Sequence, residues 1–478
     1  MSREKNILFY KLDWSIILIY LILVCFGWFN IYSTTSDSEV IENIFDFSKP
    51  YGMQLIWIAS AFVLAFFILM INSRFYSVFS YFIYFAVILL LIAVLFLGKE
   101  VNGSKSWFVI GPMRLQPAEF AKIATALALA KAMSTYGFKL KTIEGWTKVL
   151  GILLLPVALI LLQKDWGSAL IFFTFIFMFY REGLLGWVLA AAFFMVGLFI
   201  MSLLIDPVMV FIVLLGISII LFAFINRRYL HAFIAVAIIT GLFFGIVFIL
   251  DTFSINLSHK QEFIIIGSAL AALLAGVIIY AVKTKLRNIY FILLFFVGSL
   301  AISYSVDYIY DNLLKSHHRD RIEDMLGIKS DIKGAGYNVH QAKVAIGSGG
   351  FAGKGYLQGT QTRLNFVPEQ STDFIFCTVG EEWGFVGTFF LIALYVTLLI
   401  RIIMISERQK NTFARIYGYC VASIIFCHFF INIAMTIGLA PVIGIPLPFI
   451  SYGGSSLWSF TILLFILLKL DSVRMGER

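Results

Sequence analysis

The sequence predicts an all-α polytopic membrane protein, a bundle of about 14 transmembrane helices with one large polar loop before the twelfth. Hydrophobic residues make up 61% of the 478 residues and charged residues only 13%, a composition that excludes a soluble globular protein. Apolar runs of about 20 residues, the length that crosses a bilayer, recur along the chain. The first run is too long for the core of a signal peptide, so we interpret it as a retained span.

Hydropathy places the individual spans. The fifth and sixth are short and form a predicted hairpin whose tip reads QKDWG. In order, the predicted spans are 14–33, 52–71, 77–98, 117–134, 149–163, 167–181, 185–204, 208–226, 230–250, 262–282, 288–309, 374–401, 414–436 and 451–470.

The charged residues predict the orientation of these spans. Every second loop is rich in Lys and Arg, whereas the first loop of the other set carries four acidic residues, and basic loops are typically cytoplasmic. Both termini are therefore predicted to be cytoplasmic, and the net charge of +9 reflects topology and does not indicate nucleic-acid binding. The basic residues concerned include Arg74, Lys131, Lys139, Lys141, Arg227, Arg228, Lys283, Lys285, Arg287, Arg401, Arg408, Lys410, Arg415 and Arg474.

Three segments are predicted on the outer face: 99–116, the hairpin tip around Asp165, and the long loop 310–372. A loop of this length without obvious secondary structure is usually functional or disordered. Aromatic and apolar residues are interleaved with its glycines, so we expect it to fold back onto the membrane surface.

Ionisable residues begin the fourth span. Pro117 starts the predicted helix, and Glu119 in its first turn shares a face with Lys122. Charged groups inside spans are costly and indicate function. Equally, the two can form a structural pair that only offsets its own burial. Trp107 and Arg114 in the preceding loop would complete a corner with an aromatic ring and two cations.

Asp373 lies where the long loop meets the twelfth span and precedes three apolar residues. Partly apolar surroundings are expected to raise its pKa toward the range of a general base. The alternative is an ordinary N-cap of that span. Glu381 and Glu382 lie two turns deeper, and at least one is expected to face a polar interior.

The stretch GSGGFAGKG fails the Walker pattern in its glycine spacing and in the residue after Lys354. Lys343 and Lys354, with exposed backbone N–H groups, are candidates to hold an anion, but the glycines equally allow tight turns. His317, His318 and His340 lack metal-ligand spacing, and the four cysteines lack a CxxC pair. One carboxylate and several cations at a membrane surface suit the transfer of a sugar from a lipid pyrophosphate.

At this point the chain resembles a known family. The segments WFVIGPMRLQPAEFAKI, QKDWGSA, GAGYNVHQAKVAIGSGG, GKGYLQGTQ, FVPEQSTDFIF and PVIGIPLPFISYGGSS are similar, in order, to the signature segments of the SEDS family of bacterial cell-wall polymerases. The third-last and last of these look more like the elongation (RodA-like) members than the division members.

The resemblance implies a peptidoglycan glycosyltransferase that polymerises lipid II at the outer face of the bacterial inner membrane. It implies that Asp373 is the essential carboxylate, and that a class B penicillin-binding protein, other elongation-complex membrane proteins and membrane lipid are partners. It also implies an association with a divalent cation, Mg or Mn, although no metal ligands are assigned. The positions that match the family's other functional residues are Trp107, Arg114, Glu119, Lys122, Asp165, Lys343, Lys354 and Glu369.

Family members typically have fewer spans before the large periplasmic loop 310–372. The predicted organisation is therefore N-terminal family helices in 1–184, inserted helices in 185–287, and C-terminal family helices in 288–478. Two alternatives to the enzyme stay open: a lipid II flippase, or a non-enzymatic scaffold for the penicillin-binding protein.

Overall fold

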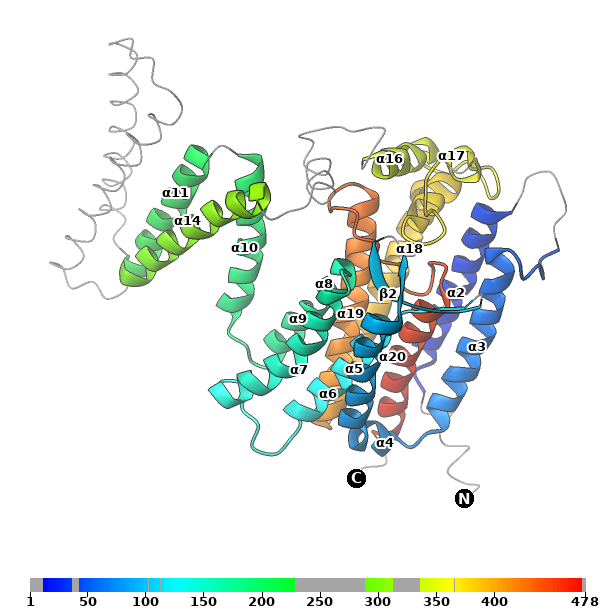
Figure 1. Cartoon of the computed structure of the whole chain (residues 1–478), viewed down its shortest axis with the longest axis horizontal. Coiled ribbons are helices and arrows are strands. Elements are labelled where there is room, and N and C mark those ends of the chain that lie inside the picture. The colour runs from blue at the N-terminus through cyan, green and yellow to red at the C-terminus, as the bar shows by residue number, and fades with distance from the viewer. Residues whose placement is uncertain are drawn as a thin grey trace, which may run out of the picture. The chain divides into compact units, whose positions relative to one another are not determined.

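The computed structural model describes residues 12–36, 43–101, 103–111, 113–205, 207–227, 289–312, 336–364 and 366–474. The chain forms two compact units, and Figure 1 labels their elements. Unit 1 comprises Met1–Leu189 and Asp320–Arg478, and unit 2 comprises Ala190–Arg319.

The helices confirm a polytopic membrane bundle. Within the described ranges, nine helices are long and apolar enough to cross a membrane. The predicted spans 230–250 and 262–282 lie outside the described residues. The helices that correspond to the other predicted spans are α2 (Trp14–Thr35), α3 (Pro50–Met70), α5 (Ser80–Leu97), α6 (Pro117–Met133), α7 (Ile143–Leu162), α8 (Trp166–Phe172) with α9 (Phe175–Arg181), α10 (Gly186–Leu204), α11 (Pro207–Asn226), α14 (Ile289–Asn312), α18 (Ile375–Glu407), α19 (Thr412–Thr436) and α20 (Gly454–Val473).

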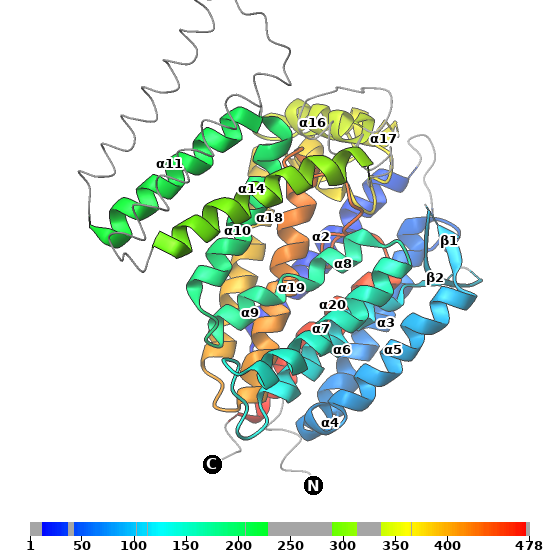
Figure 2. The same cartoon turned by 60° about the vertical axis from the view of Figure 1, so that its left-hand side comes forward.

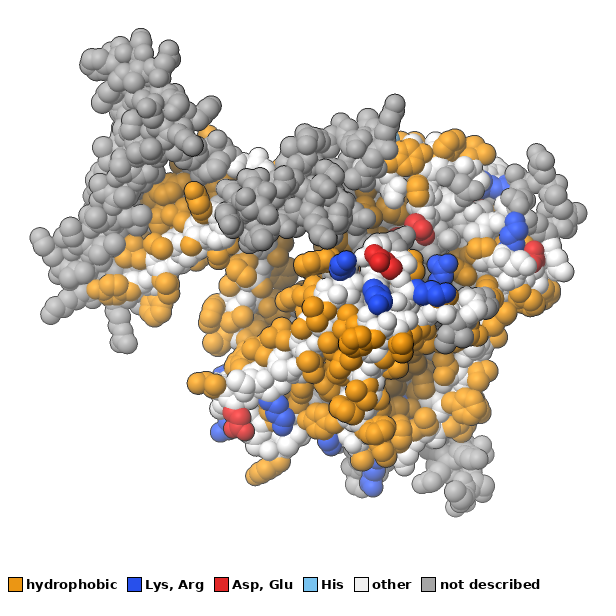
Figure 3. Space-filling model, in the orientation of Figure 1, with side chains coloured by type: hydrophobic (Ala, Val, Ile, Leu, Met, Phe, Trp, Pro, Cys, Tyr) orange, Lys and Arg blue, Asp and Glu red, His pale blue; other side chains and the backbone are white. Residues whose placement is uncertain are grey.

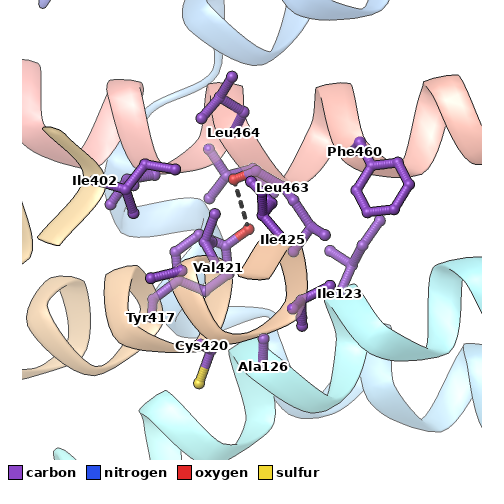
Figure 4. Close-up of a cluster of buried hydrophobic side chains, with 14 of the residues drawn as sticks. Ile123, Ala126, Ile402, Tyr417, Cys420, Val421, Ile425, Phe460, Leu463 and Leu464 are labelled. Atoms are coloured by element: carbon purple, nitrogen blue, oxygen red, sulfur yellow. Dashed lines mark hydrogen bonds between the residues drawn. The ribbon is translucent and has the colours of Figure 1, made fainter. Parts of the chain in front are cut away.

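Helix α6 lies at the centre of unit 1. It contacts α5, α7, α19 and α20, and Figure 2 shows it among them. Its run of alanines allows close helix approach, which is how helices pack in lipid. In the core between these helices, the Tyr417 hydroxyl donates to the Leu463 carbonyl at 3.1 Å, and Ile123 and Ala126 of α6 belong to the same buried cluster (Figure 4).

Helix α18 is interrupted at Gly384, whose φ of 64° is left-handed. A Cβ at this position would lie 2.2 Å from the backbone nitrogen of Gly353, so the glycine-rich stretch packs backbone against backbone here. Residues 375–382 are all buried, which suits polar and irregular backbone at membrane depth. Gly349 and Gly353 of GSGGFAGKG therefore serve close backbone packing, whereas Gly350 and Gly355 have a positive φ and allow turns.

Two predicted loops contain regular structure. Segment 99–116 forms an antiparallel sheet in the order β1 (Lys99–Val101), β2 (Ser104–Ile110) and β3 (Met113–Leu115), a departure from the all-α prediction. The long loop, whose sequence shows no obvious secondary structure, contains α16 (Tyr337–Gly349) and α17 (Thr360–Arg363). Helix α16 contacts α18, and α17 contacts both α16 and α18. The apolar patterns in these segments are too short for hydropathy to distinguish a helix, a strand or a loop.

The two chain ends of unit 1 meet at one end of the bundle. Arg408, just after α18, pairs with Asp13 at 3.3 Å before α2 and donates from Nε to Asp471 at 3.0 Å near the end of α20. In Figure 1 this end, marked by α4 (Ser73–Val78), is opposite β2, α16 and α17. Figure 3 shows unit 1 as largely hydrophobic between its two ends, with charged side chains gathered toward them.

Unit 2 has a small core of its own. Leu198, Val210, Leu214 and Phe296 are buried together. The hydroxyls of Ser202 in α10 and Ser303 in α14 lie 2.8 Å apart. Paired hydroxyls satisfy each other inside an apolar helix group.

Candidate functional site

Asp373 lies in a tight turn immediately before α18. The carbonyl of Glu369 accepts hydrogen bonds from the backbone N–H groups of Thr372, Asp373 and Phe374, at 3.1–3.2 Å. The N-cap of α18 is Phe374, so the alternative of Asp373 as N-cap is wrong. Glu369 is exposed, and its carboxylate accepts the Thr372 hydroxyl at 3.1 Å. Glu369 thus closes the turn that presents Asp373.

A second segment lies against this turn: residues 437–453, which we call the connector because they join α19 to α20. Buried Asn432 of α19 donates to the Asp373 carbonyl at 2.8 Å and to the Ile445 carbonyl at 2.7 Å. A Cβ at Gly444 would lie 3.3 Å from Asp373 Oδ2. Asn432 therefore fixes the Asp373 turn to the connector, and the half-buried carboxylate faces it.

The end of the connector and the start of α20 also reach the Arg114 strand. Ser451 Oγ donates to the Thr372 carbonyl at 2.5 Å, and four residues later Ser455 Oγ donates to the Arg114 carbonyl at 2.8 Å. Burial raises the pKa of the Tyr452 hydroxyl, and the nearby Arg114 charge is among the effects that partly offset this shift. The Asp373 turn and exposed Arg114 are thus bridged by one short stretch of chain.

Trp107 is half-buried in β2, opposite Lys99 in the sheet. Asp165 is the N-cap of α8: its Oδ1 accepts the Ser168 N–H at 3.0 Å. Its Oδ2 accepts the side-chain amide of Gln116 at 2.7 Å, next to Arg114 and the start of α6. The structure therefore gives Asp165 a structural part in holding the hairpin tip to the site.

Glu119 and Lys122 are both buried and form an ion pair at 2.8 Å. Lys122 Nζ also lies 2.8 Å from Nε2 of His428. An ammonium only donates, so Nε2 accepts, and the proton on Nδ1 donates to the Pro446 carbonyl at 3.2 Å. A chain of contacts therefore runs from α6 through α19 to the connector, while the corner of Trp107, Arg114 and Lys122 stays a prediction.

Lys354 is engaged with Glu381. The two form an ion pair at 2.6 Å, and Lys354 Nζ also donates to the Thr360 hydroxyl at 2.7 Å. The fully buried Glu381 carboxylate accepts three backbone N–H groups, of Thr360, Gln361 and Thr362, at 2.8–2.9 Å. Glu381 thus organises α17, which confirms that at least one of the two carboxylates faces a polar interior.

Glu382 is the second buried carboxylate, and it accepts the hydroxyl of Ser33 in α2. This contact joins α18 to α2. Beside it lies segment 350–363, which we call the covering segment. Burial chiefly raises the pKa of Tyr356 in that segment, with a contribution from Glu382, to about 12, so its phenol is neutral at neutral pH.

Lys343 is exposed on α16 and lies against the end of α19. A Cβ at Gly438 would be 2.3 Å from its Nζ. The face of α16 beside it packs through Val339 and Ala342 onto Phe374, the neighbour of Asp373. Lys343 has no acidic partner among the residues the structure describes.

Asn432 and His428 were not selected from the sequence, although both are polar residues inside the apolar run 414–436. That position was a usable signal, because polar groups within spans are costly unless partnered. Gln116 gave no such signal, since it lies in the predicted outer segment 99–116, and Ser451 gave none because it is the first residue of the predicted span 451–470.

In the described part of the chain, no three His, Cys, Asp or Glu side chains gather closely enough to hold a metal ion. These residues therefore do not form a protein ligand set for the implied divalent cation.

Comparison with known proteins places the chain in a family. The model of the FtsW, RodA and SpoVE family, described as cell cycle proteins, matches residues 13–216 and 266–475. The chain belongs to the SEDS family. A Treponema pallidum SEDS relative, named peptidoglycan glycosyltransferase RodA, is 31% identical over 470 residues, which cover 96% of this chain and 97% of the relative. Escherichia coli K12 MrdB, also named a peptidoglycan glycosyltransferase, is 48% identical over 145 residues, or 30% of this chain and 39% of MrdB.

Solved structures share the SEDS fold. One chain comes from a structure titled "Structural coordination of polymerization and crosslinking by a peptidoglycan synthase complex", with a TM-score of 0.60, 22% identity, and coverage of 98% of this chain and 99% of that one. The crystal structure of Thermus thermophilus RodA gives a TM-score of 0.52 at 22% identity and covers 97% of both chains. The family matches leave 217–265 unmatched; the assignment of 185–287 as an insertion stays a prediction.

Proposed function

We propose that this SEDS protein is a RodA-like peptidoglycan glycosyltransferase that polymerises lipid II at the outer face of the inner membrane during cell elongation. The enzyme class is that of its full-length relative, named peptidoglycan glycosyltransferase RodA. The proposed mechanism rests on one observation. Hydrogen bonds hold the Asp373 turn against the connector, beside Arg114, at the end of unit 1 opposite Arg408.

In the proposed reaction, Asp373 accepts the proton of the acceptor sugar hydroxyl as that oxygen attacks the anomeric carbon of the donor glycan. The bond from this carbon to the pyrophosphate breaks, and undecaprenyl pyrophosphate leaves with the electron pair. A single displacement inverts the anomeric centre and needs no covalent enzyme intermediate, so one carboxylate is sufficient.

The ion pairs in the structure limit which cations can stabilise the pyrophosphate leaving group. Lys122 and Lys354 are already paired with Glu119 and Glu381. Arg114 and Lys343 are exposed and adjoin the two sides of the connector. We therefore assign stabilisation of the pyrophosphate to Arg114 and Lys343, with Trp107, in the strand that pairs with the Arg114 strand, as a sugar-stacking candidate.

The proposed orientation puts both termini in the cytoplasm, because the arginines at the Arg408 end would then follow the positive-inside pattern. A class B penicillin-binding protein and other membrane proteins of the elongation complex are the proposed partners. Support for the first is the fold shared with a chain of the peptidoglycan synthase complex.

The test is polymerisation of labelled lipid II by the full chain reconstituted with its partner. Asp373→Asn should lower the rate by about 10²- to 10⁴-fold, the usual contribution of a general base. Glu100→Gln, a matched change at an exposed carboxylate of β1, should keep the parent rate. Polymerisation at the parent rate by folded Asp373→Asn would refute the base assignment.

The same assay separates the alternatives. An enzyme lengthens glycan strands in detergent without any membrane gradient, whereas a flippase or a scaffold does not. Arg114→Ala should reduce lipid II turnover more than partner binding, and the reverse order would favour the scaffold.

A further inference from the structure

A cavity lies at the end of unit 1 opposite Asp373. Its volume is about 280 Å³, and it is enclosed by α4, the turn between α18 and α19, and the end of α20. Helix α18 runs 33 residues from the Asp373 turn to this end, so the two sites are about 50 Å apart along the helix. The cavity has no part in the glycosyl-transfer mechanism.

The wall of this cavity is positively charged. Arg74, Lys410 and Arg474 line it, and no acidic residue does. Arg74 and Lys410 are exposed and have no acidic partner among the described residues. Arg474 lies 3.8 Å from Asp471, but that carboxylate is shared with Arg408. Cations without local carboxylates leave a net attraction for an anion.

Neutral donors face the same space. Ser73 and Ser77 contribute hydroxyls, and Asn411 an amide. Lys131 Nζ donates to the Ser77 hydroxyl at 3.3 Å, which places another positive charge behind this wall. Hydroxyls and amides beside cations form a hydrogen-bonding site suited to phosphate oxygens.

Apart from Gln409, the remaining wall is apolar, and the cavity lies at the ends of membrane spans. Val78, Phe413, Leu470 and Val473 line it, and α3, α18 and α20 end close by, at Met70, Glu407 and Val473. Basic side chains are visible along this lower edge of unit 1 in Figure 3. A soluble anion gains nothing from the apolar wall, whereas a lipid presents a phosphate and an apolar glycerol ester together.

We propose that this cavity binds the phosphodiester headgroup of an anionic phospholipid. Basic pockets between helix ends are a known mode of anionic-lipid recognition. The volume is near the lower limit of small-molecule sites, about 300 Å³, which suits a headgroup with its acyl chains left in the bilayer. On the proposed orientation, the lipid belongs to the cytoplasmic leaflet.

The experiment counts lipids bound to the full chain by native mass spectrometry, during titration with dioleoyl-phosphatidylglycerol or dioleoyl-phosphatidylcholine in a neutral detergent. The parent should retain phosphatidylglycerol at concentrations where phosphatidylcholine is lost. The double variant Arg74→Gln, Lys410→Gln should bind phosphatidylglycerol roughly 30-fold more weakly, since each cation near a membrane surface contributes about fivefold. Its phosphatidylcholine binding should not change.

The matched control is Lys139→Gln, Lys141→Gln, which removes the same charge from exposed positions between α6 and α7. It should bind phosphatidylglycerol like the parent; an equal loss in both double variants would mean diffuse surface charge and would overturn the proposal. Val78→Trp fills the cavity from an exposed position without changing charge and should also weaken phosphatidylglycerol binding. If millimolar inorganic phosphate displaced the lipid from the parent, the site would be one for soluble anions, and the lipid assignment would be wrong.

Discussion

The buried pair of Glu119 and Lys122 offers a test that separates a structural role from a functional one. Lys122→Met leaves the Glu119 carboxylate, which is 3% exposed, without its counter-ion and leaves His428 without its donor. Removing one partner of a buried pair costs about 3–5 kcal/mol. Glu119→Gln should cost a similar amount, because it strands the Lys122 ammonium.

The double variant Glu119→Gln, Lys122→Met removes both charges at once. Replacing a whole buried pair by neutral groups of similar volume is often neutral or stabilising. We therefore expect the double variant to unfold within about 1 kcal/mol of the parent, with a coupling of several kcal/mol between the two sites. Thermal unfolding in detergent, ranked across the four proteins, measures this.

Activity should follow a different pattern. The double variant lacks the link from Lys122 through His428 to the connector, and Glu119 Oε2 has no hydrogen-bond partner among the described residues. A buried carboxylate oxygen without a hydrogen-bond partner is rare, and it indicates that a further hydrogen-bond donor binds there. We expect polymerisation of lipid II to stay at least about tenfold below the parent although stability returns. Parental activity in the stable double variant would refute a functional role for the pair, and a double variant as unstable as either single change would refute the pairing energetics.

Two further predictions concern neighbouring groups. Glu381→Gln should destabilise the protein by about 3–5 kcal/mol and expose segment 350–363 to limited proteolysis, because its carboxylate accepts three backbone N–H groups and an ammonium. Glu369→Gln is the control, since this exposed carboxylate lies outside segment 350–363 and accepts the Thr372 hydroxyl, and equal proteolysis of both variants would contradict this reasoning. Asn432→Ala should cost about 1–3 kcal/mol and lower kcat more than it raises KM, because the Asp373 turn loses its tie to the connector. Thr436→Val, whose hydroxyl bonds only within its own helix, should leave kcat unchanged, and a matching loss of kcat there would count against a specific role for Asn432.

The sequence by itself determined the membrane bundle and the position of Asp373. An apolar run long enough to cross a bilayer predicts a span without reference to the rest of the chain, because all residues of the run lie in the same lipid environment. For the same reason, the boundary where the polar loop meets α18 places Asp373 at a helix entrance. The pairing of Glu119 with Lys122 was also readable, because three residues along a helix share a face.

Only the tertiary structure decided which of the candidate groups are already engaged. Lys343 and Lys354 look alike in sequence, yet Lys354 is neutralised by Glu381, 27 residues away, while Lys343 lies against Gly438. Likewise, Lys122 meets His428 across 306 residues, and no periodicity of either helix predicts that contact. Hydropathy and helical spacing are local properties, whereas the partner of a buried charge is set by which helices pack together. Which charged groups at this site form ion pairs therefore depends on the packing of α6, α16, α18 and α19.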